Sequence, residues 1–272
     1  MATTTFPAAL VAPRRSLART IAIYAKEAKY ELLKNLRIPV YAISTIAFPL
    51  MFYVLFGIVL GRNNAAVHND NATYMLATMG CFGVIAVALF GFGVSLAIER
   101  GQGWLQVKRA SPMPVSAYFF GKLFAAVTFS TVIMLMLLTV GFFFGGVRLP
   151  LGTAAKLLGT LVAGAIPFSA MGLAIGYFAK PNSAPAVVNL IYLPMSFCSG
   201  LWIPLFMLPH GLQTFARFLP AYHMSQLALG IVGMTTEPTP AWGHVEALIA
   251  FTMICLGLAA WGYRRDEGQM YG

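Results

Sequence analysis

Residues 74–98 read YMLATMGCFGVIAVALFGFGVSLAI, and this run contains no charged side chain. A helix needs about 20 apolar residues to cross the hydrocarbon core of a bilayer. The run is long enough to predict a membrane-spanning helix, which ends where Glu99 and Arg100 supply the first charges.

Five further apolar runs accompany it, at residues 38–61, 119–145, 157–178, 186–208 and 245–263. The last is the weakest, because Glu246 lies at its start. Run 186–208 contains Pro194 and Pro204, which predict a kinked or broken span. The pattern predicts an all-α integral membrane protein with six transmembrane helices.

The composition agrees with this class. The 272-residue chain is 59% hydrophobic and 10% charged, whereas a soluble domain carries about 25% charged residues. This deficit excludes an ordinary soluble enzyme, a disordered protein and a disulfide-stapled secreted domain. The net charge of +10 does not indicate nucleic acid here, because the charges lie between the apolar runs.

Motifs for nucleotide or metal chemistry are absent from the sequence. It has no G-x-x-x-x-G-K-[ST] loop and no H-E-x-x-H motif. Its cysteines and histidines are scattered, which favours packing residues over ligands; they are Cys81, Cys198, Cys255, His68, His210, His223 and His244. We expect neither a catalytic nor a metal site.

The positions of Lys and Arg predict the orientation. With the amino terminus inside, 14 of the 18 basic residues fall on the inner side, and four fall outside: Arg62, Arg148, Lys156 and Arg217. Both termini are therefore predicted to be cytoplasmic, with a cytoplasmic loop at 99–117 and an extracellular segment at 207–244. We expect an arm at 1–37, a transmembrane domain at 38–263 and a cytoplasmic tail at 264–272.

The arm contains a pattern typical of an amphipathic helix. Apolar residues recur at helical spacing and face away from most of the basic ones; they are Leu17, Ile21, Tyr24, Ala28 and Leu32. This pattern predicts an interfacial helix whose basic side meets anionic lipid headgroups. A plain juxtamembrane arm is the alternative.

The predicted loop at 99–117 has a distinctive centre. Trp104, Leu105 and Val107 lie beside Lys108 and Arg109, and Pro112 and Pro114 follow. A short basic helix with an apolar side could insert into a partner's groove. It could equally be an interfacial loop whose Trp lies at headgroup depth.

The chain resembles the ABC-2 type transporter permeases, the membrane subunits of ATP-binding-cassette exporters. The resemblance rests on Glu99-Arg100-Gly101 with Leu105, on Gly121-Lys122-Leu123 at the start of the third span, and on Leu219-Pro220-Ala221-Tyr222-His223. It implies that nucleotide binding lies on a separate ATPase, so that ATP and Mg are held by the partner and this chain needs no cofactor. It also implies two ATPase copies and a second permease copy, identical or related, in the inner membrane.

In that family the loop after the second span is a coupling helix that docks on the ATPase. Transferred to this sequence, the expected coupling residues are Glu99, Arg100, Gly101, Trp104, Leu105 and Arg109. Replacing Leu105 with Asp is then expected to detach the ATPase while leaving membrane insertion intact.

Mildly polar residues inside the spans suggest a path for an amphipathic or hydrophobic substrate, such as a drug-like molecule, a lipid or a lipid-linked glycan. They are Ser44, Thr45, Ser95, Asn189, Ser196, Ser199 and Trp202. Hydrogen bonds between helices are the alternative explanation. Small-residue pairs such as Gly172 and Gly176 are expected to serve packing within the chain.

Two rival functions remain at this stage. The chain could be a membrane scaffold that binds partners without transport, or a transporter driven by an ion gradient. The second is disfavoured, because no carboxylate lies in the middle of a span. Lys122 intrudes on the third span near its inner end, where its stem is expected to reach the interface.

Overall fold

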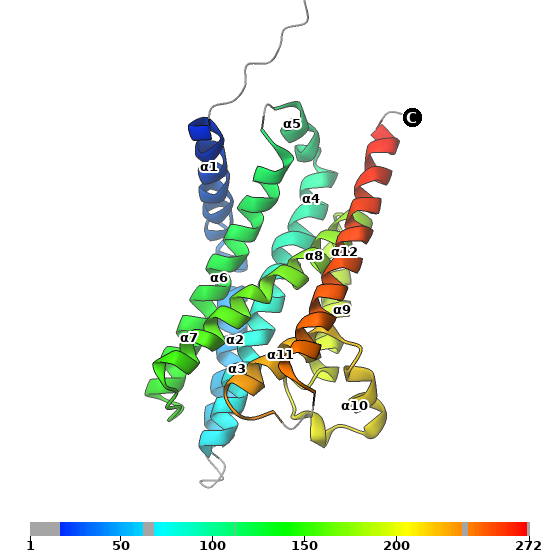
Figure 1. The fold of residues 1–272 in the computed structure, drawn as a ribbon. Helices are drawn as coiled ribbons and strands as arrows, with labels where there is room; N and C mark the ends of the chain where they lie inside the picture. Colours follow the sequence, from blue (N-terminus) through cyan, green and yellow to red (C-terminus); the bar gives the residue numbers. More distant parts are fainter. Residues whose placement is uncertain (1–16, 62–67, 112, 236–238, 271–272) are drawn as a thin grey trace, which may run out of the picture.

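The computed structural model describes residues 17–61, 68–111, 113–235 and 239–270. Within these residues every regular element is a helix (Figure 1). Five segments are long and apolar enough to cross a membrane. The predicted all-α membrane protein is therefore confirmed.

The five spanning segments combine several of the helices. The first joins α2 (Pro39–Phe52) to a π-helical turn, η1 (Tyr53–Val59), and the second joins α3 (His68–Ala88), η3 (Leu89–Val94) and α4 (Ser95–Gly101). The third is α6 (Val115–Phe143), the fourth is α7 (Leu151–Ala163) with α8 (Ala165–Phe178), and the fifth is α12 (Ala241–Met270). Because α12 continues to Met270, the predicted tail at 264–272 begins as a helical extension.

The run at 186–208 differs from a full span. Its helix, α9 (Ala184–Cys198), has 15 residues, which is about 23 Å of helix against a hydrocarbon core of about 30 Å. The helix keeps Pro194 inside it and ends before Gly200, whose φ of 77° is a left-handed conformation that favours glycine. The predicted break is confirmed, but it follows Cys198 and leaves a sixth apolar helix that is shorter than the other spans.

The segment after α9 folds back onto the bundle. It contains η4 (Leu205–Met207), α10 (His210–Ala216) and α11 (Pro220–Ile231). Eight of the residues of α11 are buried, and the helix packs against α3, α7 and α12. The predicted extracellular segment at 207–244 therefore includes a helix that forms part of the core.

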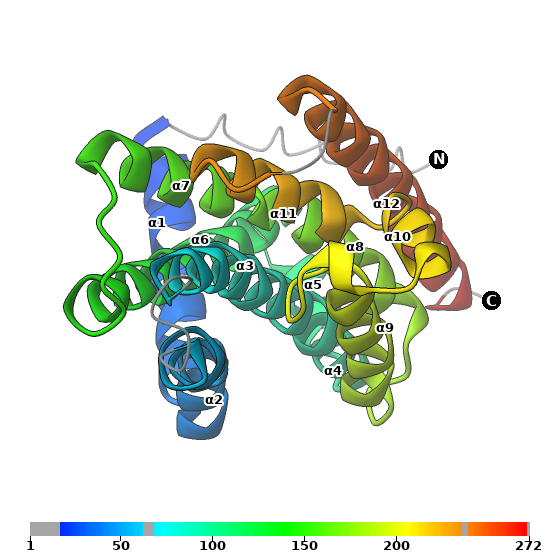
Figure 2. The ribbon, with the colours of Figure 1, turned by 90° about the horizontal axis from the view of Figure 1, so that it is seen from below.

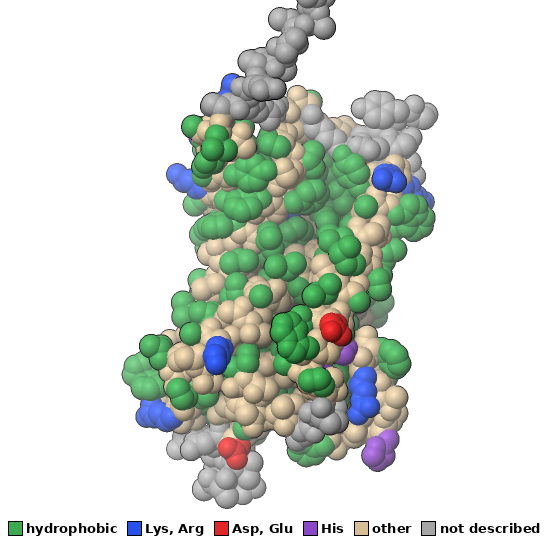
Figure 3. Space-filling view, in the orientation of Figure 1, with side chains coloured by type: hydrophobic (Ala, Val, Ile, Leu, Met, Phe, Trp, Pro, Cys, Tyr) green, Lys and Arg blue, Asp and Glu red, His purple; other side chains and the backbone are tan. Residues whose placement is uncertain are grey.

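The two ends of the bundle have different elements. We call the end with α1 (Leu17–Leu36), α5 (Trp104–Ala110) and the carboxyl end of α12 the inner end, and the end with α10 the outer end (Figure 1). Apolar side chains cover much of the surface between them, and most of the Lys and Arg visible on this face lie toward the two ends (Figure 3). This distribution matches a protein whose middle lies in lipid.

The second span is the centre of the packing. In its most apolar window 67% of the residues are buried, against 17% for α12. Viewed from the outer end, α3 lies between α2 and α11 (Figure 2). Where this span meets α8, a Cβ on Gly172 would lie 3.0 Å from the Ala88 carbonyl oxygen, and one on Gly176 would lie 3.0 Å from that of Gly93. The glycine pair thus serves packing within the chain, as expected.

Candidate functional site

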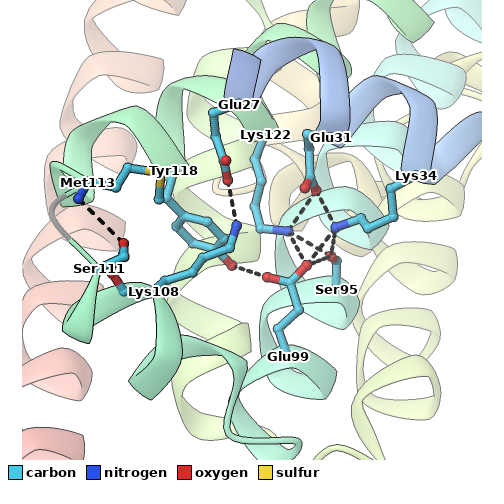
Figure 4. Close-up of polar contacts among 10 residues, drawn as sticks. All are labelled: Glu27, Glu31, Lys34, Ser95, Glu99, Lys108, Ser111, Met113, Tyr118 and Lys122. Carbon is cyan, nitrogen blue, oxygen red and sulfur yellow. Dashed lines mark hydrogen bonds and ion pairs between the residues drawn. The ribbon is translucent and has the colours of Figure 1, made fainter. Parts of the chain in front are cut away.

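Three helices contribute opposite charges to one buried cluster at the inner end. Glu31 and Lys34 come from α1, Glu99 with Ser95 from α4, and Lys122 from α6 (Figure 4). In each helix the two cluster residues are spaced i, i+3 or i, i+4, with Tyr118 as the partner of Lys122 on α6, so each pair lies on one face. We call these six residues the charge cluster.

The distances within the charge cluster are those of direct ion pairs. Lys122 Nζ lies 2.9 Å from Glu31 Oε1 and 3.1 Å from Glu99 Oε1. Lys34 Nζ lies 2.6 Å from the same two oxygens. Ser95 Oγ lies 2.7 Å from Lys122 Nζ, and the Tyr118 hydroxyl donates to Glu99 Oε2 at 2.6 Å. Two ammonium groups thus balance two carboxylates.

Because these charged side chains are buried, each needs an opposite charge beside it. The side chain of Lys122 is only 1% exposed and that of Glu31 only 5%. An ionised group buried without a partner costs several kcal/mol, so each member depends on the others. The expectation that Lys122 reaches the interface is wrong: carboxylates from two other helices neutralise it inside the bundle.

The pKa values of the two α1 residues reflect the cluster. Burial acts to raise the pKa of Glu31, but the ammonium groups of Lys122 and Lys34 outweigh it, so the pKa is lowered. Burial likewise acts to lower the pKa of Lys34, but Glu99 and Glu31 leave it raised. Both side chains therefore stay charged at neutral pH.

Further contacts hold α1 against the segment that follows α4. Lys108 on α5 pairs with Glu27 on α1 at 2.5 Å, and its Nζ lies 4.3 Å from the centroid of the Tyr118 ring. The Tyr24 hydroxyl lies 2.6 Å from Ser116 Oγ at the start of α6. These contacts therefore join α1 both to α5 and to the start of α6.

The helix α1 forms where the sequence predicts it, but only part of its apolar face is buried, and that buried face also contains polar residues. Ala28 is buried and Leu32 packs against the core, whereas Leu17 and Ile21 are 77% and 60% exposed. Its buried face also carries Glu31 and Asn35. Local periodicity could not show this, because the cations that neutralise Glu31 come partly from another helix.

Arg100 fixes the other side of the site. Its guanidinium donates to the carbonyl of Tyr177 and, at 2.8 Å, to that of Ala179, both at the end of α8. It also lies 3.7 Å from the carboxylate of Asp266 on α12. Arg100 thereby joins the inner ends of α4, α8 and α12.

The helix α5 has one buried and one exposed side. Leu105 is 8% exposed and packs with Leu96, Tyr118 and Tyr177. Trp104 and Val107 are 55% and 61% exposed. The exposed apolar pair therefore lies on a helix whose buried side packs against the inner ends of the helices that the charge cluster and Arg100 hold together.

The structure brings five of the six expected coupling residues to this site in different roles. Glu99 and Arg100 make contacts within the chain, and Gly101 packs so tightly that an added Cβ would overlap the ring of Pro181. Trp104 presents an exposed surface, and Leu105 is part of the core. The side chain of Arg109 lies outside the described residues.

The expected path residues do not form one group. Ser95 belongs to the charge cluster, and Asn189 is exposed on α9. Ser44 and Thr45 are half-buried on α2. Ser196, Ser199 and Trp202 are different, because the hydroxyl oxygens and the indole nitrogen are buried without a hydrogen-bond partner in the described part of the chain.

Two of the scattered histidines meet at the outer end. The Nδ1 atoms of His223 and His244 are 2.9 Å apart, and His223 Nε2 lies 3.0 Å from the Arg217 carbonyl. Among the described residues no group of three His, Cys, Asp or Glu could hold a metal ion. A pair of this kind is a hydrogen-bonded contact.

Several members of the site were not predicted as such. Glu27, Glu31, Lys34 and Tyr118 were not singled out, and Ser95 was assigned to the substrate path. The signal in the sequence was the spacing of the acidic and basic residues on successive helices, but which helices meet is a property of the fold.

Comparison with known proteins gives consistent results. The sequence profile of the ABC-2 type transporter family matches residues 27–232. A Bacillus subtilis (strain 168) protein named "Putative transport permease YvfS" is 27% identical over 249 residues, which cover 90% of this chain and 98% of that protein. The chain belongs to the ABC-2 type transporter family and is a multi-pass transmembrane permease.

Proposed function

We propose that this chain is the transmembrane subunit of an exporter powered by a separate ATPase that docks on α5. The observation that carries the proposal is the exposed pair Trp104 and Val107 on a helix whose other side is buried. Apolar groups of this kind, and Trp in particular, are typical anchors of protein interfaces. The ATPase would hold ATP and Mg, and this chain needs no cofactor of its own.

The contacts that link α5 to the other helices of the inner end support a mechanical role for α5. Glu27–Lys108 joins α5 to α1, the charge cluster joins α1 to α4 and α6, and Arg100 joins α4 to α8 and α12. A displacement of α5 by a closing ATPase would therefore reach five helices through short, charged contacts. Two ATPases and a second copy of the permease, identical or related, complete the proposed assembly in the inner membrane.

The proposed cargo is amphipathic or hydrophobic, such as a drug-like molecule, a lipid or a lipid-linked glycan. Buried polar atoms of Ser196, Ser199 and Trp202 have no hydrogen-bond partner among the residues that the structure describes, and this supports a few weak polar contacts with the cargo beside an aromatic wall. The indole of Trp202 lies 4.7 Å from the ring of Phe52 and 5.5 Å from that of Phe82, centroid to centroid. Unpaired polar atoms at this depth are costly unless water or a solute meets them.

The test is co-purification of the permease with its ATPase after co-expression with the neighbouring genes. We expect the double change Trp104→Glu and Val107→Glu to abolish ATPase retention, while the permease still elutes as a folded, membrane-extracted protein. Trp104→Phe should keep the partner. Lys26→Glu, on the exposed side of α1, is a control for altered charge at the inner end.

The expectation for Leu105→Asp needs correction. Because Leu105 packs inside the chain, this change would place a carboxylate against Leu96 and Tyr177 and destabilise the fold itself. Retention of the ATPase by the Trp104 and Val107 double variant would contradict docking on α5. A permease that captures no ATPase at all would favour the scaffold alternative.

A further inference from the structure

A pocket at the inner end of the bundle has no lining residue on α5. It has a volume of about 400 Å³ and lies between the ends of α4, α8 and α12. Its lining includes Arg100, Phe178, Lys180, Pro181, Arg265 and Asp266. A cavity of this size is in the range of small-molecule sites.

The depth of the pocket follows from the helices around it. The second span ends at Gly101, the fourth at Phe178 and the last at Asp266, and all three residues line the pocket. Three spans that end at one place put the pocket at the level of the lipid headgroups. Lys and Arg side chains are visible over this end of α12 (Figure 3).

The charges of the pocket favour an anion. Arg100 and Asp266 both line it, and they lie 3.7 Å from each other as an ion pair. Lys180 and Arg265 are exposed at the rim, and neither has an ion-pair partner among the described residues. Three cations against one carboxylate leave an excess of two positive charges around the pocket.

The surface beside the pocket faces lipid. Phe178 and Trp261 are 43% and 59% exposed, and their ring centroids are 5.4 Å apart. Aromatic rings of this kind are typical of the membrane–water interface. On α12, Leu258 is also exposed, and this helix is the least buried of the spans.

We propose that this pocket binds the phosphate head group of an anionic phospholipid from the inner leaflet. Lys180 and Arg265 would contact the phosphate, and the acyl chains would lie against Trp261 and Leu258. Basic pockets between transmembrane helices at the inner surface have the chemistry for such head groups. The apolar wall that continues from the pocket favours a lipid over a water-soluble protein.

The experiment measures binding of dioctanoyl phosphatidylglycerol to the purified full chain by native mass spectrometry in detergent. Dioctanoyl phosphatidylcholine and inorganic phosphate are the comparison ligands. We expect Lys180→Gln with Arg265→Gln to weaken phosphatidylglycerol binding at least tenfold. The matched control is Lys26→Gln with Lys29→Gln, which removes the same charge from exposed positions of α1 and should bind as the parent does.

A variant that keeps both charges distinguishes a loss of lipid binding from a folding defect. Lys180→Arg with Arg265→Lys keeps both charges and should bind like the parent, whereas normal binding by the Gln double variant would overturn the proposal. Equal loss in the α1 control would mean that total charge matters and the pocket does not. Inorganic phosphate that competes as well as the lipid would assign the pocket to a soluble anion. Loss of a co-purified ATPase with lipid binding intact would make it a protein interface.

Discussion

The charge cluster at the inner end and the region of Tyr53 and Ser199 at the outer end differ in how their buried polar groups are paired. At the inner end, Lys122 is almost wholly buried yet contacts two carboxylates and a hydroxyl. At the outer end, Tyr53 and Ser199 are buried with hydroxyl oxygens that have no partner in the described residues. Paired charges make the inner end rigid. Unpaired buried polar atoms are instead places where water, a solute or a rearranged neighbour can supply the missing hydrogen bond.

This difference is consistent with the proposed docking of an ATPase at the inner end. Under the proposed mechanism, the ion pairs across α1, α4 and α6 would keep the inner end together when the ATPase displaces α5. The described contacts of the outer end include aromatic packing and single hydrogen bonds, such as that of Tyr74 with the Gly200 carbonyl. The comparison leads to four predictions, ordered by the size of the expected effect.

The largest effect is expected from Lys122→Met. Removing one partner of a buried ion pair costs about 3–5 kcal/mol, because Glu31 and Glu99 are left to share Lys34. We expect a strong drop in the melting temperature and in the monodisperse fraction after size-exclusion chromatography. Lys156→Met, on an exposed position of α7, is the control and should change stability by less than about 0.5 kcal/mol. Equal melting temperatures would contradict the role of the cluster.

Gly101→Ala tests the packing beside the cluster. The added methyl group would overlap Pro181, whose ring cannot rotate away. Overpacking of this kind costs about 1–3 kcal/mol. Gly257→Ala on α12 is the matched control, because a Cβ there meets no atom within 4 Å. If both variants melt like the parent, α4 and the α8–α9 connection move more freely than the structure indicates.

Tyr74→Phe tests the outer end. The Tyr74 hydroxyl donates to the Gly200 carbonyl at 2.5 Å and supports the turn that ends α9. Loss of this hydrogen bond should lower the free energy of unfolding by about 1 kcal/mol. Tyr41→Phe makes the same change where the hydroxyl has no partner in the described part of the chain, and should be nearly neutral. Thermal melts of both variants under the same conditions decide the comparison.

The smallest effect is expected from pH. Burial lowers the pKa of His223 and outweighs the Arg217 carbonyl, which acts to raise it. The unfolded state therefore binds a proton first as the pH falls below about 6.5, and the native state loses stability from there downward. Glu31, whose pKa is lowered, stays ionised over this range. The outer end should weaken with acid before the inner end does.

The measurement is the melting temperature at pH 7.5 and pH 5.5. The parent should lose a few degrees on acidification, and His223→Gln should lose less. The groups around His223 are His244, Tyr222 and the Arg217 carbonyl. An equal loss in both proteins would show that another group titrates in this range.

The membrane class and most helices could be predicted because bilayer crossing depends on a long, local apolar run. The short length of α9 and the burial of α11 could not, since both depend on the helices that pack against them. The same limit applies to the site. The Glu99-Arg100-Gly101 motif indicated the loop that contains the candidate site, but exposure separates Trp104 from Leu105, and exposure is a tertiary property.

The sequence by itself determined that this chain lies in a membrane, which end carries the basic charge and which family it resembles. These features rest on composition, on run length and on short motifs. Only the tertiary structure decided that Lys122 is neutralised by Glu31 and Glu99, that α1 buries a charged face, and that Arg100 joins three helices. The physical reason is that a buried charge is tolerated only beside its counter-charge, and the counter-charge can lie 91 residues away along the chain.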